Sequence, residues 1–133
     1  MTFPSIWYGV FCIGLLIVND KLYAKNLNKS ERHAFYVESF VEGLGIPWGM
    51  AFLPDGRLLV SEREGRLRLI DREGNLSNPL ANVPPVRAKG QGGLLDVALH
   101  PQYETNGWIY LSYSQERGNG DSFTAIARTR LNG

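Results

Sequence analysis

The chain has 133 residues, which is room for one small domain at most. Fourteen lysines and arginines against thirteen aspartates and glutamates leave a formal charge of +1, which argues against a nucleic-acid-binding protein with its concentrated basic surplus. The single cysteine excludes an intrachain disulfide and a cysteine-built zinc site, and two histidines 67 positions apart argue against a histidine metal cluster.

An apolar run, IWYGVFCIGLLIV, occupies residues 6–18. A helix of this length spans about 20 Å, against about 30 Å for the hydrocarbon core of a bilayer. The run is typical of the apolar centre of an export signal, and Ala24 offers a cleavage site. We therefore expect a signal at 1–24, a mature domain at 25–133 and no stable membrane span after cleavage. Because basic residues follow the run instead of preceding it, an uncleaved anchor and a cytoplasmic start are the alternatives.

The remainder of the chain consists of short β-rich runs separated by turn residues. Pro54-Asp55-Gly56 predicts a tight turn between two strands. The alternation in the run that follows places Leu67 and Leu69 on one face of a strand. The charged residues around the next turn indicate a solvated hairpin face (Glu62, Arg63, Glu64, Arg66 and Arg68). In this half of the chain the predicted strands are 34–41, 48–53, 57–61 and 66–71.

The pattern then repeats. Ala51-Phe52-Leu53-Pro54 resembles Ala98-Leu99-His100-Pro101, and the two prolines are 47 positions apart. Strands are predicted at 94–99, 108–112 and 124–131. A period of this length with three or four strands per unit is typical of an all-β fold, the β-propeller, and a β-sandwich with two similar hairpins is the alternative. A propeller has about four to eight blades. We therefore expect this chain to be the N-terminal part of a longer protein, covering the first one and a half to two blades.

A glycine-rich segment, Lys89-Gly-Gln-Gly-Gly-Leu-Leu-Asp96, is the densest candidate for chemistry. Its glycines allow close backbone approach to a ligand, and the Gln91 amide could orient sugar hydroxyls or a quinone carbonyl. From the residues alone, a glycine-rich turn with a solvated Gln91 is the favoured reading. The segment lacks the ending of a phosphate-binding loop.

Other polar and aromatic residues favour structural roles. Asp96 lies in an apolar strand, where alternation places Leu94, Asp96 and Ala98 on one face, and we expect its carboxylate to bind loop amides. His100 precedes Pro101 without an evident partner and is expected to be a hydrogen-bonded loop histidine. Trp48 and Trp108 are expected to pack between blades, and no metal ligand is assigned.

Three segments resemble the opening of the glucose/sorbosone dehydrogenase family, in its branch of soluble aldose sugar dehydrogenases that use pyrroloquinoline quinone. They are GIPWGMAFLPDG at 45–56, LLVSER at 58–63 and GQGGLLDVALHP at 90–101, and the resemblance extends over about 37–131. It implies a six-bladed propeller exported to the periplasm or beyond. The implied cofactors are pyrroloquinoline quinone and calcium, and the implied partners are an aldose substrate and an external electron acceptor.

Of the family's site residues, the glutamine beside cofactor and sugar maps onto Gln91. The resemblance thereby reverses the reading of Gln91 as merely solvated. The family's catalytic histidine is expected beyond Gly133, so no catalytic residue is assigned and the chain alone is expected to be inactive. His100 is not that histidine, because its Leu-His-Pro context belongs to the repeated turn. A non-catalytic propeller that binds a carbohydrate or protein and a non-functional gene remnant are the alternatives.

Overall fold

The computed structural model describes residues 27–131, so the export signal predicted at 1–24 lies outside the described residues. The chain divides into two compact units between Glu38 and Ser39. In the first unit, β1 (Leu27–Lys29) and β2 (Ala34–Tyr36) form a short antiparallel hairpin. The strand predicted at 34–41 is shorter in the structure and ends at Tyr36. Across residues 27–131, no helix has the length and apolar character needed to cross a bilayer.

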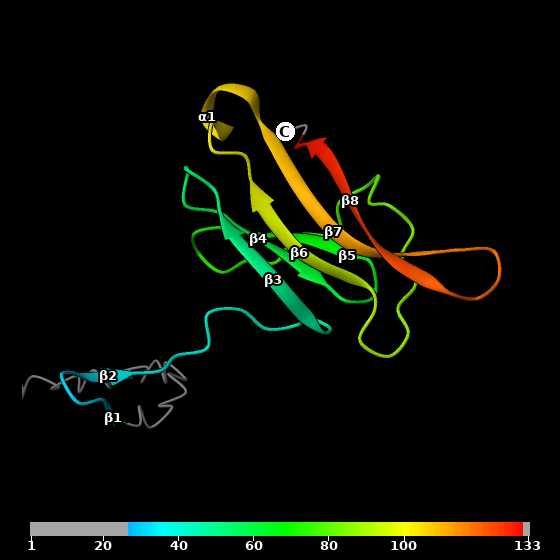
Figure 1. Ribbon diagram of the computed structural model, residues 1–133. Helices are drawn as coiled ribbons and strands as arrows, with labels where there is room; N and C mark the ends of the chain where they lie inside the picture. The colour runs from blue at the N-terminus through cyan, green and yellow to red at the C-terminus, as the bar shows by residue number, and fades with distance from the viewer. Residues whose placement is uncertain (1–26, 132–133) are drawn as a thin grey trace, which may run out of the picture. The chain divides into compact units, whose positions relative to one another are not determined.

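The second unit contains two antiparallel sheets with the same strand order (Figure 1). The first sheet consists of β3 (Pro47–Phe52), β4 (Leu58–Glu62) and β5 (Arg66–Ile70). The second consists of β6 (Leu94–Leu99), β7 (Trp108–Glu116) and β8 (Ser122–Arg130). The predicted repeat is confirmed, since Pro54 and Pro101 each follow the first strand of a sheet. The sequence pattern missed the short helix α1 (Tyr103–Asn106), which lies in the longer second connection.

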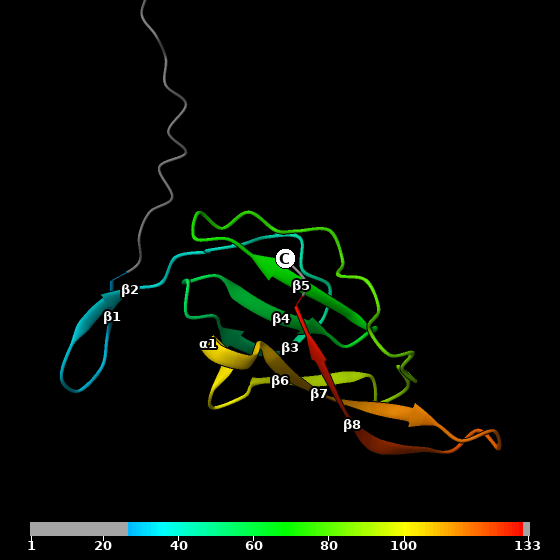
Figure 2. The same ribbon diagram turned by 90° about the horizontal axis from the view of Figure 1, so that it is seen from above.

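A shared apolar core joins the two sheets. Leu59 of the first sheet and Ile109 of the second are fully buried in it, and β6 lies next to β3 and β4 (Figure 2). Leu80, Val83 and Val86 from the connection between the sheets pack against its side. The buried members of this core are Leu53, Leu59, Leu67, Leu94, Val97, Ile109 and Leu111. Burial of these side chains from both sheets is the main force that holds the sheets together.

The other face of β4 and β5 is covered by the segment that precedes β3. Leu58, Val60 and Ile70 form a second apolar cluster there, packed against Val41 and Leu44 of that segment. We call residues 39–46 the strap. Because one sheet face lies on the second sheet and the other lies under the strap, every residue of β4 is buried.

Glu62 lies on the strap side of β4 and is fully buried, so the predicted solvated hairpin face is wrong at this residue. Its carboxylate accepts hydrogen bonds from the Gly45 amide and from Arg66 Nε, the latter at 2.6 Å, and Arg68 Nη1 lies 3.5 Å away. Burial raises the pKa of Glu62, but these hydrogen bonds and the two positive charges outweigh it and hold the pKa below its usual value. The charged pattern predicts a solvated face because it gives no sign that the strap covers Glu62.

Ser61 and Gly49 lie where the first sheet contacts β6. The buried Ser61 hydroxyl donates a hydrogen bond to the Leu95 carbonyl of β6 and accepts one, at 2.9 Å, from the Gly49 amide of β3. A Cβ on Gly49 would lie 2.9 Å from the Asp96 Cα, a distance that side-chain-bearing residues do not tolerate. Ser61 therefore links β3, β4 and β6 through one side chain.

A bulge in β6 breaks the predicted alternation. The pairing with β7 shifts register between Leu94 and Val97, and both of these residues are buried in the same core. Asp96, between them, is exposed. The expectation that the tryptophans pack between blades is not met between these two sheets: Trp48 is 46% exposed, and Trp108 lies beneath the guanidinium groups of Arg128 and Arg130.

Candidate functional site

The loop of residues 87–93 carries Gln91 to the end of the second unit where β3 and β6 begin. Hydrogen bonds hold both ends of this loop. The Arg87 amide donates to the Ser114 carbonyl at 2.8 Å, and the Ser114 amide donates to the Gly93 carbonyl at 2.7 Å. A turn inside the loop is closed by the Gly92 amide, which donates to the Lys89 carbonyl at 2.9 Å. The loop thus has a defined conformation attached to β7.

Gly93 permits the loop to touch the first sheet. Its φ is +148°, and a Cβ at this position would lie 2.1 Å from the Arg63 carbonyl oxygen. That carbonyl accepts the Leu94 amide at 2.9 Å. A residue larger than glycine would separate the loop from the turn between β4 and β5, so the glycine at this position is required by close approach.

Gln91 is exposed at the tip of this loop. Within residues 27–131 its side-chain amide makes no hydrogen bond, so its carbonyl oxygen and both N–H groups are available to a ligand. The neighbouring charge is positive: Lys89 lies two residues away, and the Arg63 guanidinium reaches the Gly90 carbonyl. This end of the molecule offers hydrogen bonds and positive charge, which suit a ligand with carbonyl and carboxylate oxygens.

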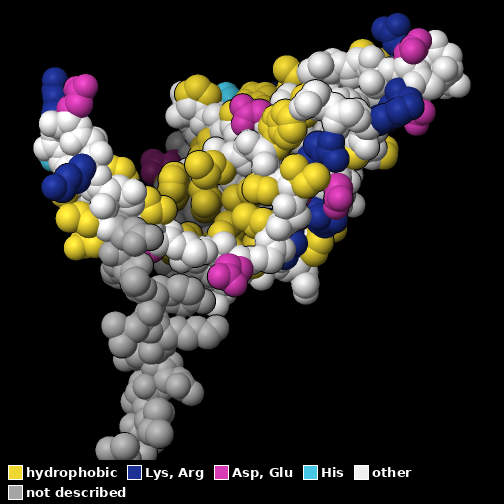
Figure 3. Space-filling model, turned by 90° about the horizontal axis from the view of Figure 1, so that it is seen from below, with side chains coloured by type: hydrophobic (Ala, Val, Ile, Leu, Met, Phe, Trp, Pro, Cys, Tyr) yellow, Lys and Arg dark blue, Asp and Glu magenta, His cyan; other side chains and the backbone are white. Residues whose placement is uncertain are grey.

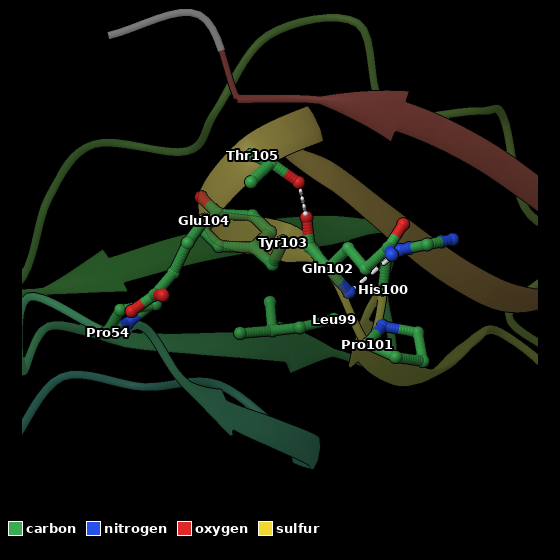
Figure 4. A pocket seen from close by; sticks show the side chains of 8 residues that line it. All are labelled: Pro54, Leu99, His100, Pro101, Gln102, Tyr103, Glu104 and Thr105. Carbon is green, nitrogen blue, oxygen red and sulfur yellow. Dashed lines mark hydrogen bonds between the residues drawn. The ribbon is translucent and has the colours of Figure 1, made fainter.

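The structure places a pocket at the opposite end of β6, roughly 20 Å away by strand length. It has a volume of about 460 Å³ and is formed by Pro54, Leu99 and the connection through α1 (Figure 4). His100 lines it, and its Nδ1 lies 3.0 Å from the Gln102 amide and 2.8 Å from Asn106 Nδ2. The ring also stacks on Tyr110. The expectation of a hydrogen-bonded loop histidine is confirmed, and this pocket does not contain Gln91.

Asp96 holds the bulge of β6. Its Oδ1 accepts the Val97 amide at 2.9 Å, and its own amide donates to Ser112 Oγ at 3.0 Å. The carboxylate therefore has a structural role, as expected, but it binds an amide of its own strand and not the loop amides that were predicted. Among the residues the structure describes, no cluster of three histidine, cysteine or acidic side chains could hold a metal ion.

A hydrophobic surface lies along β3. Trp48, Met50 and Phe52 of this strand are all substantially exposed. The view in Figure 3 shows hydrophobic side chains gathered in the middle of one face of the molecule.

Sequence reasoning missed the role of Arg63, which contacts the loop on both sides of Gln91. The signal was weak, because an arginine in a charged turn resembles any solvated residue. The glycine pair after Gln91 was the sequence signal that could have indicated this contact. A glycine is needed where another part of the chain lies too close for a side chain, and at Gly93 that part is Arg63.

The family model described as Glucose / Sorbosone dehydrogenase matches residues 44–133. Aldose sugar dehydrogenase YliI of Escherichia coli is 44% identical over 122 residues, which cover 91% of this chain and 31% of that protein. Human Hedgehog-interacting protein is 33% identical over 99 residues, covering 67% of this chain and 14% of that protein. The chain thus spans less than a third of the length of the curated relatives that it matches.

A solved structure, the aldose sugar dehydrogenase of Streptomyces coelicolor in its form bound to pyrroloquinoline quinone, superimposes with a TM-score of 0.63 at 35% identity. The match covers 72% of this chain and 28% of that one. The two sheets described above therefore correspond to part of a sugar dehydrogenase propeller.

Proposed function

Because this chain belongs to the glucose/sorbosone dehydrogenase family, we propose that the protein oxidises aldose sugars at the anomeric carbon and uses pyrroloquinoline quinone as cofactor. The observation that carries the proposal is Gln91, an exposed amide without a hydrogen-bond partner among the described residues, presented by an ordered loop. The loop lies inside the region that matches the family. An exposed amide on a fixed backbone suits ligand orientation, since little conformational freedom is lost on binding.

The residues near Gln91 fit one edge of the cofactor. The Gln91 N–H groups can donate to a quinone carbonyl, and the positive charge of Lys89 suits the carboxylates of the quinone. Calcium has no comparable support, because the described residues provide no cluster of ligands for it. We therefore derive no step through calcium.

When bound, pyrroloquinoline quinone would accept the hydride that leaves the anomeric carbon of the sugar. Gln91 would orient the reacting groups: its N–H donates to a carbonyl oxygen, while its Oε1 accepts a hydrogen bond from a sugar hydroxyl. His100 does not act as the base in this proposal, because its Nδ1 is engaged with the α1 connection at the far end of β6. The base is proposed to be a histidine outside the present chain.

We also propose that the mature chain, residues 25–133, acts in the periplasm or outside the cell and passes electrons to an external acceptor. Support comes from the apolar run at 6–18, which precedes all the described residues.

Quinone titration and dye reduction test the function. The purified full-length protein, with pyrroloquinoline quinone and calcium, should bind the quinone and reduce a redox dye when glucose is added. Gln91→Ala should weaken quinone binding or turnover about tenfold, because one hydrogen bond is lost. Gln102→Ala is the matched control, since this exposed glutamine lies at the opposite end of β6. Absence of both quinone binding and dye reduction in the wild type would reject the proposal.

A non-catalytic propeller that binds a protein is the second candidate function. The similarity to Hedgehog-interacting protein favours it, because the name of that relative describes binding to a protein and no catalysis. A protein that bound no quinone yet captured a protein partner through the end that carries Gln91 would support this candidate.

A further inference from the structure

Arg63 begins the turn between β4 and β5, and its backbone is fixed from two sides. Its amide donates to the Ile46 carbonyl of the strap at 2.8 Å. Its carbonyl accepts the Leu94 amide at 2.9 Å. The preceding residue, Glu62, binds the strap at Gly45. These backbone contacts fix the position of Arg63 independently of its side chain.

The Arg63 side chain contacts the loop at a second place, in addition to the backbone contact with Leu94. Its Nη1 donates to the Gly90 carbonyl, and its Cγ lies where it would be 2.7 Å from a Cβ on Gly93. Together with the Leu94 amide, these contacts flank Gln91 on both sides in the sequence. The exposed amide of Gln91 thus projects from a segment whose two ends are held by one residue.

The charge of Arg63 has no carboxylate partner within residues 27–131, unlike the charges of the nearby Arg66 and Arg68, which both reach Glu62. Arg63 Nε is also buried without a hydrogen-bond acceptor in this part of the chain. The loop carbonyl is therefore the polar contact that keeps the guanidinium in place. An arginine paired with a carboxylate would not restrain the loop, whereas Arg63 donates its hydrogen bond to the loop itself.

We propose that Arg63 is a positioning residue for Gln91: it clamps residues 90–94 against the first sheet and so fixes the amide that contacts the ligand. The inference rests on the proposed function for its effect on ligand binding, but the clamp itself concerns the loop alone. Loss of the clamp should let the loop open and move Gln91 away from its ligand-ready position.

The first test is amide hydrogen exchange of residues 88–95, measured on the protein without cofactor. Arg63→Met keeps the aliphatic stem but removes the hydrogen bond and the charge, and we expect exchange in this segment to become about tenfold faster. Arg63→Lys keeps the stem and the charge and should give an intermediate rate, which also covers the case in which Arg63→Met fails to fold. The matched control is Arg57→Met, because Arg57 pairs with Asp55 in the turn after β3, at the other end of the sheet. Unchanged exchange in both Arg63 variants would overturn the clamp.

The second test is a double-mutant cycle on quinone affinity. If Arg63 acts through Gln91, Arg63→Met should weaken binding about tenfold in the wild type but add almost nothing in Gln91→Ala. A purely structural role would weaken both backgrounds equally, and that additive result would overturn the proposal. If the wild type binds no quinone, the proposed function fails, and the exchange experiment still decides whether Arg63 holds the loop.

Discussion

The two sheets of the second unit have the same strand order but differ in how many of their faces are covered. In the first sheet, β4 and β5 are enclosed between the second sheet and the strap, whereas β3 exposes Trp48, Met50 and Phe52. The second sheet has one covered face, and the opposite face carries exposed residues such as Ile126, which is 74% exposed. One repeated pattern thus produces a buried layer and a surface layer.

The arginines of the two sheets also differ in the groups that they contact. In the enclosed sheet, Arg66 and Arg68 contact the buried carboxylate of Glu62. On the open sheet, Arg128 and Arg130 lie 4.3 and 4.1 Å from the ring centre of Trp108. The largely buried Arg68 lies near an opposite charge and also donates to the Ser77 carbonyl, whereas the two arginines of the second sheet lie on an aromatic face. The arginines of the two sheets therefore have different kinds of partner.

Removal of the buried carboxylate should give the largest effect. Glu62→Ala is expected to lower the free energy of unfolding by about 3–5 kcal/mol, because Arg66 Nε and the Gly45 amide lose their acceptor and Arg68 loses its nearby negative charge. Urea denaturation measures this change. Glu64→Ala is the control and should cost less than about 1 kcal/mol, since this exposed carboxylate forms only a surface pair with Arg66. Equal losses in the two variants would contradict the enclosed position of Glu62.

A pair of isoleucines on the second sheet compares its two faces directly. Ile109 is fully buried against the first sheet, and Ile126 lies on the open face. Ile109→Ala should lower the free energy of unfolding by about 3 kcal/mol through lost burial and a cavity. Ile126→Ala should change it by less than about 0.5 kcal/mol. A large effect at Ile126 in thermal or urea unfolding would mean that something covers the open face.

The contact between the sheets depends on one hydroxyl. Ser61→Ala should cost about 2 kcal/mol, because the half-buried Leu95 carbonyl and Gly49 amide both lose a hydrogen-bond partner. Ser112→Ala is a suitable comparison, since its hydroxyl bonds the more exposed Asp96 amide within the second sheet. We expect the smaller loss at Ser112, and the opposite order in chemical denaturation would contradict the bridging role of Ser61.

Acid should weaken the first sheet gradually. The pKa of Glu62 is lowered in the folded protein, as are those of Asp55 and Asp71, which accept hydrogen bonds in turns of the same sheet. A lowered folded-state pKa stabilises the fold above the unfolded value, about 4, and this contribution is lost as the pH falls toward the folded value. Unfolding free energies measured between pH 7 and pH 3 should decline mainly below pH 4. Glu62→Gln should flatten this decline.

Local patterns in the sequence predicted most of the strands. The alternation of Leu67 and Leu69, and the turn at Pro54, depend on neighbours within a few residues, and both sheets formed where the repeat placed them. The bulge beside Asp96 and the burial of Glu62 were not predictable in this way. The bulge depends on how β6 pairs with β7, and the burial of Glu62 depends on the strap. The periodicity of a sequence carries no information about such contacts between separate segments.

The candidate site shows the same division. The glycines around Gln91 drew attention to the loop, but the residues alone favoured a solvated turn, and the family resemblance was needed to assign Gln91 to the cofactor. Arg63 could not be selected, because its partners are the Gly90 carbonyl and the Leu94 amide, and backbone groups carry no signature in the sequence.

The strap has a consequence for the order in which the molecule assembles. Gly45 and Glu62 are 17 residues apart, whereas Arg63 and Gly90 are 27 apart and Ser61 and Leu95 are 34 apart. Shorter loops close at a smaller entropic cost, so we expect the strap and the β4–β5 hairpin to associate early during synthesis. The Arg63 carbonyl would then be in place before Leu94 leaves the ribosome, ready to receive the first strand of the next sheet.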